Sequence, residues 1–141
     1  MKGQFDDPLG WRGAAAPSLT EFEALAADAY ARLPEHFRGL CENLIIQVTD
    51  FPTEEVLDQM NVETEFDLLG LFQGVGLPFQ SVSVPEQLPN MVWLYRRPIL
   101  DYWAEHEDSL GAIVTHVLVH EIGHHFGLSD ADIEAIEAGA D

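Results

Sequence analysis

Apolar residues recur at helical spacing near the start of the chain and predict a first helix there. Its apolar face consists of Phe22, Leu25, Ala26, Ala29 and Leu33. Ser18 and Glu21 have the spacing of a capping box. Thr20 and Glu23 have it too, so the pattern leaves the first helical residue open. Pro34 ends this helix or starts a second short turn, because its ring clashes with a helix interior.

A second helical pattern runs from about Ser109 to Phe126. Its broad apolar face is formed by Leu110, Ile113, Val114, Val117 and Ile122. Gly127 follows as a helix-ending glycine would. Either Ser129 or Asp130 can then cap a last helix over 131–139.

The middle of the chain has the composition of strands and turns. Residues 43–51 and 91–99 are rich in β-branched and aromatic residues and predict two strands, and 53–60 predicts a short helix. Pro98 cannot donate to a sheet ladder, which indicates an edge strand or a strand end in the second of these. Residues 70–80 indicate a strand end with turns, and 81–90 a loop.

Length and composition indicate one domain. The chain has 141 residues, enough for a single core. Residues 1–17 are rich in Gly, Ala and Pro without any period, and we expect them to form a flexible arm before a single domain over 18–141. The single cysteine, Cys41, lies in an apolar context and is expected to be buried rather than reactive.

The charge is strongly acidic, at −19 with a pI near 4.3. Such a surface repels phosphate backbones and anionic lipids, so nucleic acid and membranes are poor partners, while a divalent cation or a basic peptide is a better one. Asp6 and Asp7 stand where the apolar part of a secretory signal would begin, and we expect a cytoplasmic protein. The oligomeric state does not follow from the sequence.

His120 and His124 are four residues apart on the second predicted helix. They lie about 40° apart around its axis, so both imidazoles can reach one point and hold a Zn²⁺ ion. Glu121 lies about 60° from His124, beside such a metal, where its carboxylate can take a proton from a metal-activated water. These residues form the pattern H-E-x-x-H, which favours a metal-binding site over coincidence.

A catalytic zinc usually has three protein ligands and one open position, so another ligand is needed. Asp130 is six residues past His124 and would point away on a continuing helix. If the helix stops at Gly127, the chain can turn back, and Asp130 then has a short path to the metal. His125 lies about 140° from His120 and is expected to be packed or hydrogen-bonded instead. We expect His116 to be a satisfied or exposed polar residue rather than a ligand of a second metal.

The pattern H-E-x-x-H-x-x-G-x-x-D over 120–130 resembles the extended zinc signature of the zincin clan of metallopeptidases. Together with the segment MVWLYRRPIL, it resembles a bacterial family of small zinc metallopeptidases with a minimal zincin-like fold. The resemblance spans about 20–137 and implies an α+β fold with a short, twisted, mainly antiparallel sheet packed on an active-site helix. It also implies His120, His124 and Asp130 as zinc ligands and Glu121 as general base and acid.

The sequence departs from the larger metzincins, whose third ligand is usually His and whose chain continues into a methionine-containing turn. Only eleven residues follow Asp130, none of them Met, which leaves two functions open. The first is a zinc-dependent metallopeptidase that hydrolyses peptide bonds. The alternative is a zinc-binding regulatory or protein-interaction module with little turnover. The retained Glu121 favours the peptidase, because a purely structural zinc needs no base.

For the peptidase, segment 91–99 is the predicted edge strand to which an extended substrate could add. Tyr95, Arg96 or Arg97 could help to hold an oxyanion or a substrate carboxylate. The preferred interpretation is that Trp93 and Tyr95 alternate into the core and that the arginines pair with acids. Neither the substrate nor its cleavage specificity follows from the sequence.

Overall fold

The computed structural model describes residues 9–41, 43–74 and 90–139. Two helices come first, α2 (Leu19–Ala31) and α3 (Glu35–Arg38). The middle contains β1 (Ile45–Thr49), α4 (Glu54–Met60), the 3₁₀ turn η1 (Glu65–Asp67), β2 (Gly70–Gln73) and β3 (Met91–Tyr95). Three helices end the chain, α5 (Arg96–Ala104), α6 (Leu110–His125) and α7 (Asp130–Ala138). The predicted loop 81–90 lies almost entirely outside the described residues.

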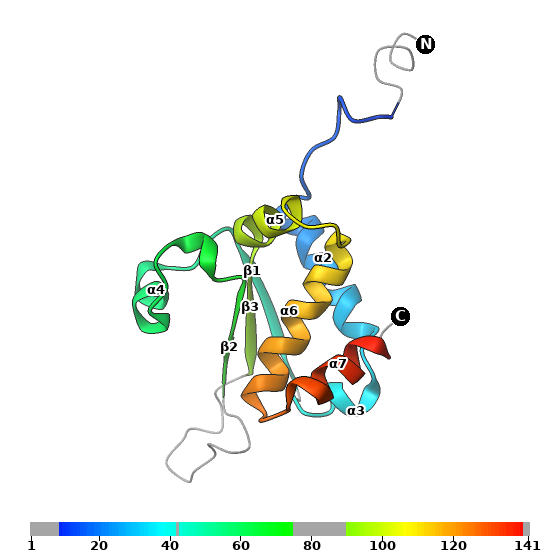
Figure 1. The fold of residues 1–141 in the computed structure, drawn as a ribbon, viewed down its shortest axis with the longest axis vertical. Coiled ribbons are helices and arrows are strands. Elements are labelled where there is room, and N and C mark those ends of the chain that lie inside the picture. Colours follow the sequence, from blue (N-terminus) through cyan, green and yellow to red (C-terminus); the bar gives the residue numbers. More distant parts are fainter. Residues whose placement is uncertain (1–8, 42, 75–89, 140–141) are drawn as a thin grey trace.

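The first helix begins as one of the two capping boxes predicts. Ser18 is the N-cap of α2, its hydroxyl accepts from the Glu21 N–H, and the Glu21 carboxylate accepts from the Ser18 N–H. Pro34 precedes α3, so the break after the first helix is confirmed. Residues 9–17 contain no helix or strand and extend away from the rest of the chain (Figure 1). Whether residues 1–17 form a flexible arm stays a prediction.

The three described strands form a mixed sheet in the order β1-β3-β2. β1 pairs with β3 in parallel, and β2 pairs with β3 antiparallel. The α+β class is confirmed, but the sheet has one parallel pair where mainly antiparallel pairing was expected. The patterns of such short strands mark which face is buried and not the direction in which each strand runs.

The strand predicted over 91–99 ends at Tyr95, and Arg96 starts helix α5. Pro98 therefore lies in the first turn of a helix, where its missing N–H breaks no hydrogen bond. The inference that this strand lies at an edge is wrong, because β3 pairs on both sides. Among the described strands, β1 and β2 form the edges.

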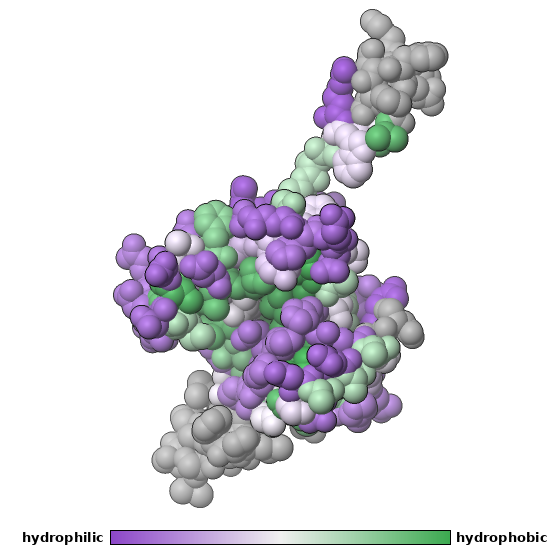
Figure 2. Space-filling view, viewed as in Figure 1, coloured by the Kyte–Doolittle hydropathy of each residue, from purple (hydrophilic) through white to green (hydrophobic). Residues whose placement is uncertain are grey.

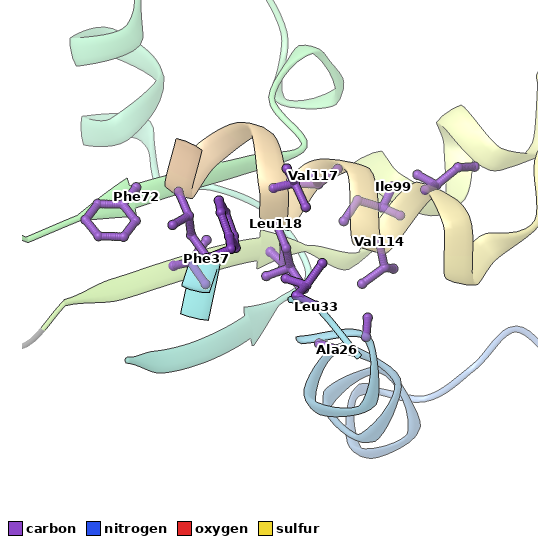
Figure 3. Close-up of a cluster of buried hydrophobic side chains, with 14 of the residues drawn as sticks. Ala26, Leu33, Phe37, Phe72, Ile99, Val114, Val117 and Leu118 are labelled. Carbon is purple, nitrogen blue, oxygen red and sulfur yellow. The ribbon is translucent and has the colours of Figure 1, made fainter. Parts of the chain in front are cut away.

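The core lies between the sheet and helices α2 and α6, with α7 packed on α6 (Figure 1). Ala26 and Leu33 from the N-terminal part lie near Val114 and Leu118 of α6 in this core, while Val117 lies on the side of α6 that faces β2 (Figure 3). Cys41 also belongs to it, which confirms that this cysteine is buried, and burial raises the pKa of its thiol to about 12 and so disfavours the thiolate. None of the helices in the described segments is long and apolar enough to cross a membrane.

Candidate metal centre

Helix α6 holds His120 and His124 at its surface because its other side is anchored in the core. Val119, which precedes His120, and Ile122, which lies between the two histidines in the sequence, are fully buried. The two imidazole centroids lie 5.2 Å apart, and the His124 side chain is 54% exposed. The structure thus places both predicted histidine ligands one turn apart on one accessible side of the helix.

The end of α6 has the geometry that the sequence predicts for Gly127, whose φ is +80°. The Leu128 N–H donates to the Gly123 carbonyl at 2.9 Å, and the Gly127 N–H donates to the His124 carbonyl at 3.1 Å. This pair of hydrogen bonds is a Schellman motif, which satisfies the last carbonyls of the helix. The chain then reverses, and the Ser129 hydroxyl caps α7 by accepting from the Asp132 N–H.

Asp130 is the first residue of α7, and the reversal at Gly127 brings it back to α6. Its Oδ1 lies 3.6 Å from Nε2 of His124. Two ligands of a tetrahedral zinc, each about 2.0–2.1 Å from the ion, lie about 3.3 Å from one another. Two imidazole nitrogens and one carboxylate oxygen on this surface therefore fit a zinc ion in donor type, and the His124–Asp130 pair fits it in spacing.

Glu121 lies on the side of α6 that meets strand β2. Its carboxylate is mostly enclosed, and burial raises its pKa to about 7. A hydrogen bond from the Phe72 backbone N–H partly opposes this rise, because it stabilises the charged form. The group next to the paired histidines is thus a carboxyl group whose pKa is near neutrality, where a general base works best.

Gly70 allows β2 to approach α6 so closely. A Cβ atom at this position would lie 2.7 Å from Val117 Cγ1 and 2.9 Å from the Trp93 carbonyl oxygen. It would also lie 3.5 Å from Cγ of Glu121. Sequence reasoning missed this role of Gly70, although a glycine inside a strand is a known sign of close backbone approach.

The surroundings of His120 favour its neutral form, the form that binds a metal. Burial, and after it the neighbouring His116, lowers the pKa of His120. Burial raises the pKa of Tyr95 to about 12, and the nearby charge of Glu121 adds to this rise. Tyr95 is thus a buried, protonated phenol close to Glu121.

The remaining candidates have structural environments. His125 stacks on Phe72 with ring centroids 4.1 Å apart, which confirms that it is packed. Arg96 pairs with Asp50 at 3.0 Å, and the Arg97 guanidinium lies 3.9 Å from the same carboxylate, so the pairing of the arginines with acids is confirmed.

The expected alternation along β3 is only partly right. Tyr95 is buried, but Trp93 is half-buried and donates through Nε1 to Oε1 of Gln73 at 2.8 Å. Val92 and Leu94 fill the core positions instead. Both faces of this central strand are at least partly covered, so the side of the tryptophan could not be assigned from a two-residue period alone.

Comparison with known families gives a result that agrees with this geometry. A family model described as zincin-like metallopeptidase matches residues 41–140. The chain belongs to the zincin-like metallopeptidase family. The match includes the whole of the sheet, α6 and α7, and membership implies zinc binding. A search of curated proteins found no match.

Proposed function

We propose that this zincin-like protein is a zinc-dependent metallopeptidase that hydrolyses peptide bonds. In this proposal His120, His124 and Asp130 hold the zinc, and Glu121 is the general base. The observation that supports it best is the placement of Glu121, which follows His120 on α6 and lies where this helix meets β2, with its pKa raised by burial. A site that only holds zinc has no need of such a carboxyl group.

When bound, zinc polarises the scissile carbonyl and lowers the pKa of a water molecule. Glu121 accepts the proton of the attacking water and then passes it to the leaving amine. The Phe72 backbone N–H faces this carboxylate and stabilises its charged form. Because Phe72 belongs to β2, the same strand that borders the site also positions the base.

The edge of the sheet beside Glu121 is suited to bind an extended peptide. The Tyr95 N–H donates to the Leu69 carbonyl at 3.0 Å, so residue 69 faces β3. Backbone groups alternate along an antiparallel strand, so those of Gly70 and Phe72 face the other edge. The Phe72 N–H there is directed at Glu121, which leaves the Gly70 groups and the Phe72 carbonyl for pairing with a substrate. We propose that a substrate pairs with β2 at this edge, in place of the central strand favoured by the sequence.

A digest of an unbiased peptide library tests the proposal. Zinc-loaded protein should cleave a subset of peptides, and the cleavage should stop with a chelator and return with zinc. Mass spectrometry of the products would also show the residues that flank the cleaved bond. A zinc-loaded, folded protein that cleaves nothing in the library would contradict the peptidase and favour the zinc-binding module.

A further inference from the structure

A second cluster of metal-binding side chains lies one turn before the H-E-x-x-H motif on α6. Among the described residues, the three side chains whose ligand atoms lie within 4.8 Å of one another are His116, His120 and Glu137. The imidazole centroids of His116 and His120 are 3.9 Å apart, closer than the 5.2 Å between His120 and His124. His120 therefore stands between two sets of possible ligands.

Glu137 comes from α7 and is carried to this place by the packing of that helix. Ile133 and Ile136 of α7 are buried in the core, which fixes the helix against α6. Oε1 of Glu137 is shielded from solvent and makes no hydrogen bond within the described part of the chain. Nδ1 of His116 lies 2.7 Å from this oxygen, but the contact lacks hydrogen-bond geometry.

A shielded carboxylate oxygen without a hydrogen bond is costly, and a bound cation is one of the arrangements that satisfy it. Two histidines and one glutamate are a known ligand set for zinc with an open fourth position. A cavity of about 370 Å³ is lined by His116 and Glu137, and Asp108 and Tyr102 also belong to its lining. It gives an ion a path to the cluster and leaves room for a further ligand.

We propose that His116, His120 and Glu137 form a second position for a divalent transition metal such as Zn²⁺. It shares His120 with the signature site, by which we mean the zinc site proposed for His120, His124 and Asp130. The two positions therefore compete for this histidine. The sequence favoured a merely polar role for His116, because nothing in a one-dimensional pattern brings Glu137 from the next helix to its side. This second position does not depend on whether the protein hydrolyses peptides.

The position can be isolated by removing the other two signature ligands with the double variant His124→Ala/Asp130→Ala. Zinc binding to the folded double variant is measured by competition with a chromophoric chelator. We expect one equivalent of zinc to remain bound. Adding either His116→Asn or Glu137→Gln should then weaken the affinity at least about tenfold, which is the lower end of the loss seen when supporting groups of metal sites are removed.

His36→Asn in the same background is the matched control, because His36 is an exposed histidine outside the cluster. It should leave the affinity unchanged. Circular dichroism verifies that each variant is folded. If either His116→Asn or Glu137→Gln misfolds, the other variant still tests the cluster. A double variant that binds no zinc, or one whose affinity is the same with His116→Asn and Glu137→Gln as without them, would overturn the proposal.

Discussion

Glu121 and Asp130 flank the same histidines in opposite environments. The Glu121 carboxyl group is enclosed between a helix and a strand, whereas the Asp130 side chain is 82% exposed. An exposed side chain with one polar neighbour contributes little to the free energy of unfolding. Asp130 can therefore bind a metal, or be replaced, with little loss of stability. The two acids can therefore be tested separately, one for binding and one for chemistry.

Asp130→Ala should weaken zinc binding while leaving the fold intact. Loss of a direct ligand should cost more than the about 10–100-fold that loss of an outer-shell partner costs. Glu134→Ala, an exposed acid on the same helix, is the matched control for the lost charge. Titration against a chelator gives both affinities, and equal values would mean that the third ligand lies elsewhere.

At the scale of elements, the periodic helices were predictable and the sheet was not. The apolar pattern of α6 and the glycine after it are local signals in the sequence. They predict both the end of the helix at Gly127 and the turn that brings Asp130 back. The order of the strands depends on contacts between distant segments, so β3 could be recognised as a strand but not as the central one. The early end of β3 was missed because a proline fits the first turn of a helix as well as a strand end.

The contact between β2 and α6 predicts a large effect of Gly70→Ala. The added methyl group would meet Val117 and the Trp93 backbone below 3.0 Å and would push the strand from the helix. We expect a loss of about 1–3 kcal/mol in the free energy of unfolding, together with slower hydrolysis because Phe72 no longer holds Glu121. Denaturant unfolding and a cleavage assay measure the two effects.

Gly111→Ala is the control for this substitution. Gly111 lies in the first turn of α6, where a Cβ atom would meet only Leu25 Cδ1, at 4.0 Å. Alanine there should be neutral or stabilising by up to about 1 kcal/mol, since it is the better helix former. Equal effects of the two substitutions would show that β2 tolerates a displacement from α6.

At the scale of the whole molecule, the net charge of −19 makes the compact state repel itself. Hydrophilic side chains cover most of the face shown in Figure 2, with apolar side chains visible between them near its middle. A bound divalent cation offsets part of the charge at one place and links two helices, α6 and α7, that meet at the proposed ligands. Metal binding should therefore stabilise the fold as a whole.

Zinc should raise the melting temperature of the protein, and a chelator should reverse the change. A ligand that binds only the folded state adds about 2.7 kcal/mol when its free concentration is 100 times the Kd. Mg²⁺ at the same concentration controls for general charge screening and should have a much smaller effect, because it prefers oxygen ligands. Equal shifts with the two ions in a thermal melt would speak against a specific nitrogen-containing site.

Comparing Glu121→Gln with the wild type at equal measured zinc content tests whether Glu121 makes this zinc site a peptidase. Glutamine keeps the size of the side chain but cannot accept the proton of the attacking water. The measurement is the rate of cleavage of one peptide identified in the library. We predict that the variant binds zinc as the wild type does and cleaves at least about 100-fold more slowly, as expected when a general base is lost. Cleavage by the variant at the wild-type rate would show that Glu121 is not the general base.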